Sequence, residues 1–120
     1  MTEIALWLNP ILALVSVAFG LIGWVAPRYT ADVLDLHPGE TTMGLSEMRA
    51  ASGALFVGLG VGAFLLGSPV AYAMIGFAWG FAALGRLTSI VMDGPADRQK
   101  WIFFLVEAVV GGMLIGLNVS

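Results

Sequence analysis

Long, uninterrupted apolar runs separated by short polar breaks make up most of the chain. The runs span about residues 4–26, 46–67, 70–92 and 100–117, and each is close to the length of helix that crosses a hydrocarbon core of about 30 Å. Within each run the hydrophobicity is continuous rather than alternating, which favours helices over membrane β-strands. The sequence therefore predicts an all-α integral membrane four-helix bundle that forms a single domain over residues 1–120.

Composition supports this prediction and excludes several classes of function. Hydrophobic residues make up 59% of the chain and charged residues 11%, too few to cover the surface of a small soluble domain. The chain has only 5 Lys and Arg residues and a net charge of −3, so it offers no basic surface for nucleic acid. Because the chain has no Cys and its single His, His37, lies in a polar segment, we expect no metal site, no cofactor and no catalytic constellation.

The polar breaks also predict an orientation. An even number of spans places both termini on one side of the membrane and the segments 27–45 and 93–99 on the other. The second side carries Arg28, Arg98 and Lys100, whereas the side of the termini carries no Lys or Arg. Lys and Arg accumulate in cytoplasmic loops, so segments 27–45 and 93–99 are predicted to be cytoplasmic.

Ionisable residues within the spans or at their ends are the strongest candidates for function: Glu47, Arg49, Arg86 and Glu107. A charge at the centre of a membrane helix costs about 2.5–3.5 kcal/mol, so each such residue needs a partner or water. All of them fall in the half of the spans nearest the predicted cytoplasmic segments, and Arg86 and Glu107 share nearly the same depth. Ser89 and Asp93 follow Arg86 at a spacing that places all three on one helix face.

Two interpretations of these charges are compatible with each other. In the structural one, Arg86 pairs with Glu107 and Arg49 pairs with Glu47, and the pairs fix the register of the helices. In the functional one, a polar pocket open to the cytoplasmic side receives a ligand, because ionisable groups within a membrane are candidate functional sites. The residues assigned to this pocket are Glu47, Arg49, Arg86, Ser89, Asp93 and Glu107.

Glycines four residues apart predict where helices pack closely, because small residues let helix backbones approach in lipid. The pairs are Gly58 with Gly62, Gly76 with Gly80, and Gly112 with Gly116. They serve packing within one subunit, between subunits, or both. Gly111 lies one turn after Glu107 and is expected to leave space above that carboxylate.

Several of these motifs together resemble an uncharacterised bacterial family of small four-span membrane proteins that is grouped with the DoxX-like proteins. The motifs are Ser46-Glu47-x-Arg49-Ala50, Gly85-Arg86-Leu87-x-Ser89-x-x-x-Asp93-Gly94, and Glu107 with Gly111. The resemblance implies a multi-pass protein of the bacterial inner membrane and marks these charged and polar residues as family features. It brings no established activity. Some DoxX-like proteins are linked to redox complexes, but this chain has no residue set that holds a redox centre.

Three functions remain open from the sequence. The first is a protein that binds lipid headgroups or small amphipathic molecules, with Arg49 and Arg86 facing the anionic part. The second is an accessory subunit that packs against a larger membrane complex, or against itself, through its glycine faces. The third is an enzyme that uses Glu107 or Glu47 as an acid or base, and it is the least favoured because pairing with Arg holds a carboxylate in its ionised form.

Overall fold

The computed structural model describes residues 1–119, which form helices and no strand. The elements are α1 (Glu3–Val25), α2 (Pro27–Val33), α3 (Met43–Arg49), the π-helical turn η1 (Ala50–Ala54), α4 (Leu55–Leu66), α5 (Pro69–Met92) and α6 (Arg98–Asn118). The all-α prediction is confirmed. Four helical stretches are long and apolar enough to cross a membrane, namely α1, the continuous stretch Met43–Leu66, α5 and α6.

The observed ends of these helices differ from the predicted spans by a few residues. Pro27, which has no backbone N–H, begins the separate helix α2 directly after the end of α1. The side chain of Asp97 accepts a hydrogen bond from the Lys100 backbone N at 3.0 Å and caps α6, which therefore begins before its apolar run. The second span likewise starts earlier, at Met43.

Two compact units make up the chain, and each is described by itself. The terminal unit comprises Met1–Leu12 and Leu66–Ser120, and the central unit comprises Ala13–Leu65. The single domain predicted from the sequence stays a prediction.

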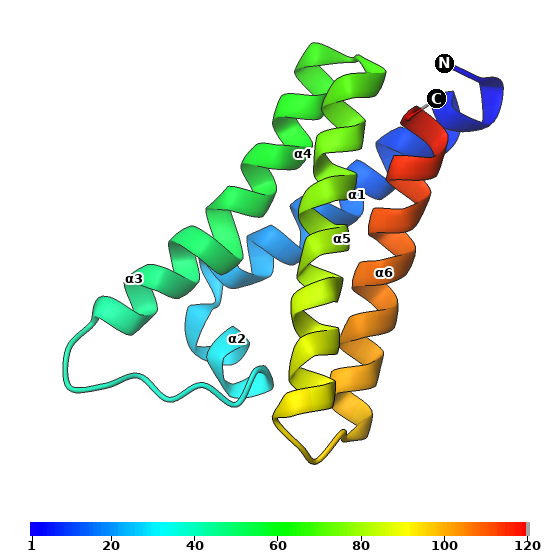
Figure 1. Cartoon of the computed structure of the whole chain (residues 1–120). Helices are drawn as coiled ribbons and strands as arrows, with labels where there is room; N and C mark the ends of the chain where they lie inside the picture. Colours follow the sequence, from blue (N-terminus) through cyan, green and yellow to red (C-terminus); the bar gives the residue numbers. More distant parts are fainter. Residues whose placement is uncertain (120) are drawn as a thin grey trace. The chain divides into compact units, whose positions relative to one another are not determined.

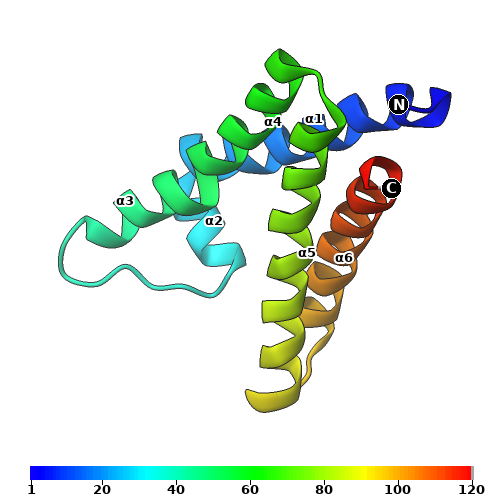
Figure 2. The ribbon, with the colours of Figure 1, turned by 45° about the horizontal axis from the view of Figure 1, so that its top comes forward.

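The terminal unit is built around the antiparallel pair of helices α5 and α6, which lie side by side in both ribbon views (Figure 1, Figure 2). A tight connection precedes the pair: Gly67 has a φ of 63°, and the Ser68 side chain caps α5 by accepting a hydrogen bond from Ala71 N. At the C-terminal end of α5, Lys100 Nζ donates a hydrogen bond to the carbonyl of the C-cap residue Asp93 at 2.7 Å.

Glycines set the distance between α5 and α6. A Cβ added at Gly76 would lie 2.9 Å from Leu114 Cβ, and one added at Gly111 would collide with the backbone of Gly80 and lie 2.9 Å from Gly76 O. The expectation that Gly111 leaves space above Glu107 is therefore wrong, because the backbone of α5 fills that space. Gly112 and Gly116 face open space within their own unit, so a role for them in contacts between subunits stays a prediction.

The first turns of α1 pack onto the end of α6 in the same unit, where the two chain ends lie close together in Figure 1. Asn9 Nδ2 donates to Asn118 Oδ1 at 2.8 Å, and Asn118 Nδ2 donates back to Asn9 Oδ1 at 2.7 Å. Asn9 is fully buried, and this reciprocal pair satisfies its amide group. Asn118 Nδ2 also donates to Leu114 O at 2.8 Å within α6.

The central unit has a glycine contact of its own, between the later turns of α1 and the helical stretch η1–α4. A Cβ at Gly20 would lie 2.7 Å from Gly53 O, and one at Gly60 would lie 2.7 Å from Ala13 O. Ser16 Oγ donates to Phe56 O at 2.9 Å across the same contact. The predicted glycines of this stretch, Gly58 and Gly62, instead have no atom within 4 Å of an added Cβ.

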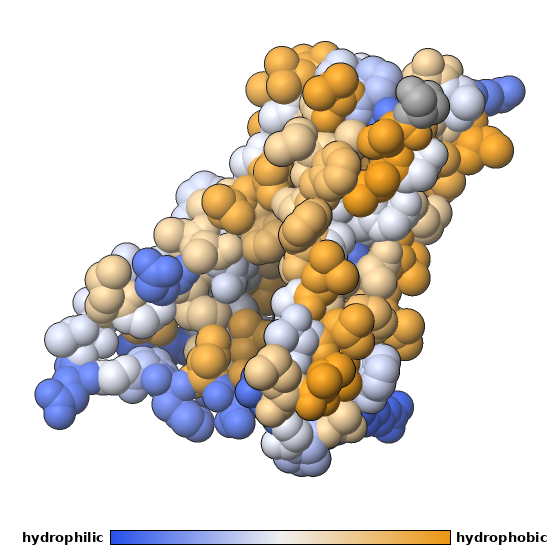
Figure 3. All heavy atoms as spheres, in the orientation of Figure 1, coloured by the Kyte–Doolittle hydropathy of each residue, from blue (hydrophilic) through white to orange (hydrophobic). Residues whose placement is uncertain are grey.

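The outer surface of the helices is apolar, as expected for segments that face lipid. Figure 3 shows hydrophobic side chains along the visible face of α5 and α6 and hydrophilic ones at the segment that joins them. Phe81, Val91 and Leu105 are among the large hydrophobic residues exposed on this pair of helices.

Candidate functional site

Arg86 on α5 and Glu107 on α6 form a two-point ion pair in the terminal unit. Arg86 Nε donates to Glu107 Oε1 at 3.0 Å, and Arg86 Nη2 donates to Glu107 Oε2 at 3.1 Å. The planar fork of the guanidinium matches the two carboxylate oxygens, which is the strongest geometry for such a pair. The contact predicted from the shared depth of the two residues is confirmed.

The surroundings of this pair are largely protein. The Glu107 side chain is 13% exposed and that of Arg86 is 33% exposed. The guanidinium carbon of Arg86 lies 5.2 Å from the centre of the Phe103 ring, one turn before Glu107, in a cation–π arrangement. Both oxygens of the carboxylate are hydrogen-bonded and the two charges cancel. The pair therefore has the properties of a structural link between two helices.

Ser89 and Asp93 lie beyond this pair, towards the end of α5. The Asp93 backbone N donates to Ser89 O at 2.8 Å, and the Asp93 carbonyl accepts a hydrogen bond from Lys100 Nζ. Neither side chain hydrogen-bonds Arg86 or Glu107 in the part of the chain that the structure describes. Their contribution to a ligand site stays a prediction.

Arg49 in the central unit has a different kind of partner. Its Nη1 donates to the backbone carbonyl of Trp24 at 2.8 Å and joins the end of α3 to the last turn of α1. Carbonyl groups in the last turn of a helix lack partners within the helix and attract cations. The expected ion pair between Arg49 and Glu47 is not formed among residues 1–119, because side chains two positions apart on one helix point away from each other.

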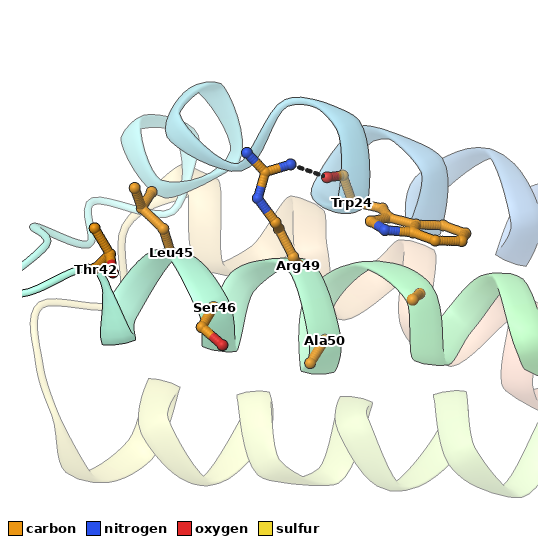
Figure 4. A pocket seen from close by; sticks show the side chains of 7 residues that line it. Trp24, Thr42, Leu45, Ser46, Arg49 and Ala50 are labelled. Carbon is orange, nitrogen blue, oxygen red and sulfur yellow. Dashed lines mark hydrogen bonds between the residues drawn. The ribbon is translucent and has the colours of Figure 1, made fainter.

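A groove of about 560 Å³ lies beside Arg49 in the central unit (Figure 4). Arg49 is the one charged residue among those that line it. Figure 4 shows its guanidinium directed towards the end of α1, with the Trp24 ring alongside. The lining residues are Trp24, Thr42, Leu45, Ser46, Arg49, Ala50 and Ala54.

A smaller cavity of about 230 Å³ lies between α2, the following segment and α3. It is lined by Ala31, Leu36, His37, Pro38, Gly44, Leu45, Glu47 and Met48. His37 Nε2 lies 3.5 Å from Asp35 Oδ1, and both side chains are almost fully exposed. Within residues 1–119, no three His, Cys, Asp or Glu side chains gather in a group that could hold a metal ion.

The residues predicted to form one polar pocket belong to both units. Glu47 and Arg49 lie in the central unit, whereas Arg86, Glu107 and the two polar residues that follow Arg86 lie in the terminal unit. A common pocket formed by both groups stays a prediction.

Sequence reasoning missed the walls of the groove at Arg49. Trp24 had a detectable signal, since it precedes the helix break at Pro27 and lies at the end of a predicted span. The run of small residues Ala50–Ala54 directly after Arg49 was another signal, because small side chains leave room beside a charged one. Neither signal by itself distinguishes a groove from ordinary helix packing.

These observations define a class: an all-α protein that has, within residues 1–119, four membrane-length helices, one ion pair between helices, and a groove whose lining contains a single arginine. The chain belongs to the DUF4345 family, whose model, described as a domain of unknown function, matches residues 2–117. No curated protein and no solved structure matches the chain.

Proposed function

We propose that this protein acts in a membrane by binding an amphipathic ligand, with the polar head of the ligand at Arg49. The groove beside Arg49 is the observation that carries this proposal. Its lining combines one cationic side chain, the hydroxyl groups of Thr42 and Ser46, and apolar walls from Leu45 and the alanines. A lipid headgroup and the first part of its hydrocarbon chain need this combination of a few polar groups on a mostly apolar surface.

The hydrogen bonds of Arg49 also support binding. A guanidinium has five N–H donors, and the structure describes one hydrogen bond from Arg49, to Trp24 O. The remaining donors and the full positive charge are available to an anion. The π-helical turn η1 follows Arg49 and supplies Ala50 and Ala54 to the groove, and such turns occur frequently at functional sites.

The Arg86–Glu107 pair has a separate role in this proposal: it holds α5 and α6 in register. Its two hydrogen bonds occupy both oxygens of the carboxylate and the matching edge of the guanidinium. A ligand that bound there would have to displace Glu107 from a pair with favourable geometry.

We place the protein in the bacterial inner membrane, among the DoxX-like proteins, with segments 27–45 and 93–99 in the cytoplasm and both termini outside. The distribution of Arg28, Arg98 and Lys100 supports this orientation. A cysteine introduced by Gly39→Cys should react only with membrane-permeant thiol reagents in intact cells, and one at Ser120 should react with impermeant reagents. The reverse labelling pattern would overturn the orientation.

A second candidate is an accessory subunit that packs against a larger membrane complex or against another copy. The observation in its favour is that Gly58, Gly62, Gly112 and Gly116 face open space within their own units. Close helix contacts in membranes use such glycines. Replacing Gly112 and Gly116 by Leu should then reduce the size of the particle in mild detergent without lowering the thermal stability of the subunit.

Ligand retention tests the first proposal. The protein is purified in mild detergent from its membrane, and native mass spectrometry measures the amphiphiles that stay bound. Arg49→Gln should lose them, whereas Arg28→Gln, which removes the same charge from an exposed position on α2, should keep them. Equal retention by both variants and the original protein would contradict binding at Arg49 and leave the accessory-subunit proposal.

A further inference from the structure

The charge balance of the groove restricts the ligand that it accepts, and this inference rests on the binding function proposed above. Arg49 is the one charged residue in the lining, and Glu47 on the same helix borders the smaller cavity instead. The groove therefore carries a charge of one positive unit. In a membrane an uncompensated charge is costly, so a ligand with a single negative charge gives the most stable complex. A second negative charge would have no cationic partner in the lining.

The extent of the groove indicates a head larger than a carboxylate. Its lining residues run from Thr42 to Ala54, which corresponds to about 18 Å along a helix at about 1.5 Å per residue. Arg49 lies near the middle of this stretch, with a hydroxyl-bearing side chain, Ser46, one turn before it and Ala50 and Ala54 after it. A fatty acid carboxylate would engage Arg49 but would leave the polar end at Thr42 and Ser46 unused.

Trp24 completes the match to a glycerolipid. Its ring lies along the groove (Figure 4), and Trp is enriched where the polar and apolar parts of lipids meet. The hydrogen bond from Arg49 Nη1 to the Trp24 carbonyl holds the guanidinium in place. The other N–H groups of the guanidinium can then donate to phosphate oxygens.

We infer that the ligand is a glycerophospholipid with a singly charged anionic phosphodiester headgroup: the phosphate lies at Arg49, the headgroup extends towards Thr42 and Ser46, and the ester region lies along Trp24 and Ala54. Phosphatidylglycerol has this chemistry. Phosphatidylcholine carries an added positive charge, phosphatidic acid carries a phosphomonoester that approaches two charges at neutral pH, and oleate carries a carboxylate.

The test uses the full chain in mild detergent, titrated separately with the dioleoyl forms of phosphatidylglycerol, phosphatidylcholine and phosphatidic acid, and with oleate. Native mass spectrometry measures the fraction of protein that retains each compound. Phosphatidylglycerol should bind at least about tenfold more tightly than each of the others, and Arg49→Gln should abolish this preference, since one charge-assisted hydrogen bond accounts for about a tenfold change. Arg28→Gln, the matched control, should keep the preference.

A second variant keeps the test decisive if Arg49→Gln weakens the fold. Ala50→Leu fills the groove but leaves Arg49 and its bond to Trp24 intact, and it should also reduce phosphatidylglycerol retention by about tenfold or more. Stronger retention of oleate or phosphatidic acid in an Arg49-dependent way would overturn the phosphodiester assignment and leave the binding function standing. Retention of all four compounds that depends on neither Arg49 nor Ala50 would overturn both.

Discussion

Arg86 in the terminal unit and Arg49 in the central unit both lie in membrane-length helices, yet they have opposite kinds of partner. Arg86 donates two hydrogen bonds, of 3.0 and 3.1 Å, to the carboxylate of Glu107, which neutralises its charge. Arg49 meets the backbone carbonyl of Trp24 at 2.8 Å, which accepts a hydrogen bond but carries no net charge. The positive charge of Arg49 therefore stays unneutralised beside a groove, whereas the charge of Arg86 is neutralised by Glu107.

This difference separates a structural charge from one that is available for binding. The cost of placing an arginine in a membrane helix is offset at Arg86 by a partner within the protein. At Arg49 the chain supplies only part of the compensation, so the remainder must come from water, from lipid or from a ligand. The local partner of each residue, more than its depth in the span, indicates its role.

The largest expected effect comes from breaking the Arg86–Glu107 pair on one side. Arg86→Met leaves Glu107 as a carboxylate without its cation and should lower the free energy of unfolding by about 3–5 kcal/mol. The double variant Arg86→Met with Glu107→Leu removes both charges and should recover most of this loss. Reversible unfolding in mixed detergent micelles gives the three free energies.

The same variants sharpen the comparison with Arg49. The double variant should retain as much bound amphiphile as the original protein, because the pair is assigned to holding α5 against α6. A stable double variant that has lost its ligand would show instead that Arg86 and Glu107 belong to the binding site, as the six-residue pocket predicted from the sequence requires.

A smaller loss should follow when α5 and α6 are forced apart near Glu107. Gly111→Leu places a side chain against the backbone of Gly76 and Gly80 and should destabilise the protein by about 1–3 kcal/mol. Gly112→Leu is the matched control, because an added Cβ there meets no atom within 4 Å. Thermal unfolding of both variants measures the difference, and equal midpoints would contradict the close contact at Gly111.

The sequence predicts the parts of this structure that depend on one dominant physical effect. Hydrophobicity locates the four membrane-length helices, and the cost of charge in a membrane pairs Arg86 with Glu107. Glycine spacing was less informative. It marked Gly76 and Gly80 but missed Gly20, Gly53, Gly60 and Gly111, none of which has a glycine four residues away. Close approach depends on which face of a helix meets its neighbour, and the spacing of glycines does not show that face.

The site at Arg49 was predicted only in part for a related reason. The residue itself is conspicuous in the sequence, but its partner is a backbone carbonyl, and every residue has one. The assignment of Glu47 as its partner followed from opposite charge alone and ignored the direction of side chains two residues apart on a helix. Polar contacts to the backbone become visible only once the helices are placed.

The amide pair of the terminal unit tests whether a neutral link matters as much as the charged one. Asn9→Leu leaves the Asn118 side chain without its reciprocal partner and should lower the free energy of unfolding by about 1 kcal/mol, less than the loss of Arg86, because amide hydrogen bonds between membrane helices are individually modest. Asn9→Leu combined with Asn118→Leu should recover part of it. A loss in Asn9→Leu that equals the loss in Arg86→Met would erase the distinction between charged and neutral links.

Substitution of Arg49 should cause the smallest change in stability, although it should cause the largest change in ligand binding. Arg49→Gln removes an exposed hydrogen bond to Trp24 O, so the free energy of unfolding should fall by less than about 1 kcal/mol. Arg49→Lys keeps the charge and a donor but loses the planar fork, so it should retain stability and an intermediate share of the ligand. Unfolding in detergent and ligand retention are measured on the same preparations. If Arg49→Gln destabilised the protein as strongly as Arg86→Met, with retention falling only in proportion to the unfolded fraction, Arg49 would be a structural link like Arg86 and the contrast between the two residues would fail.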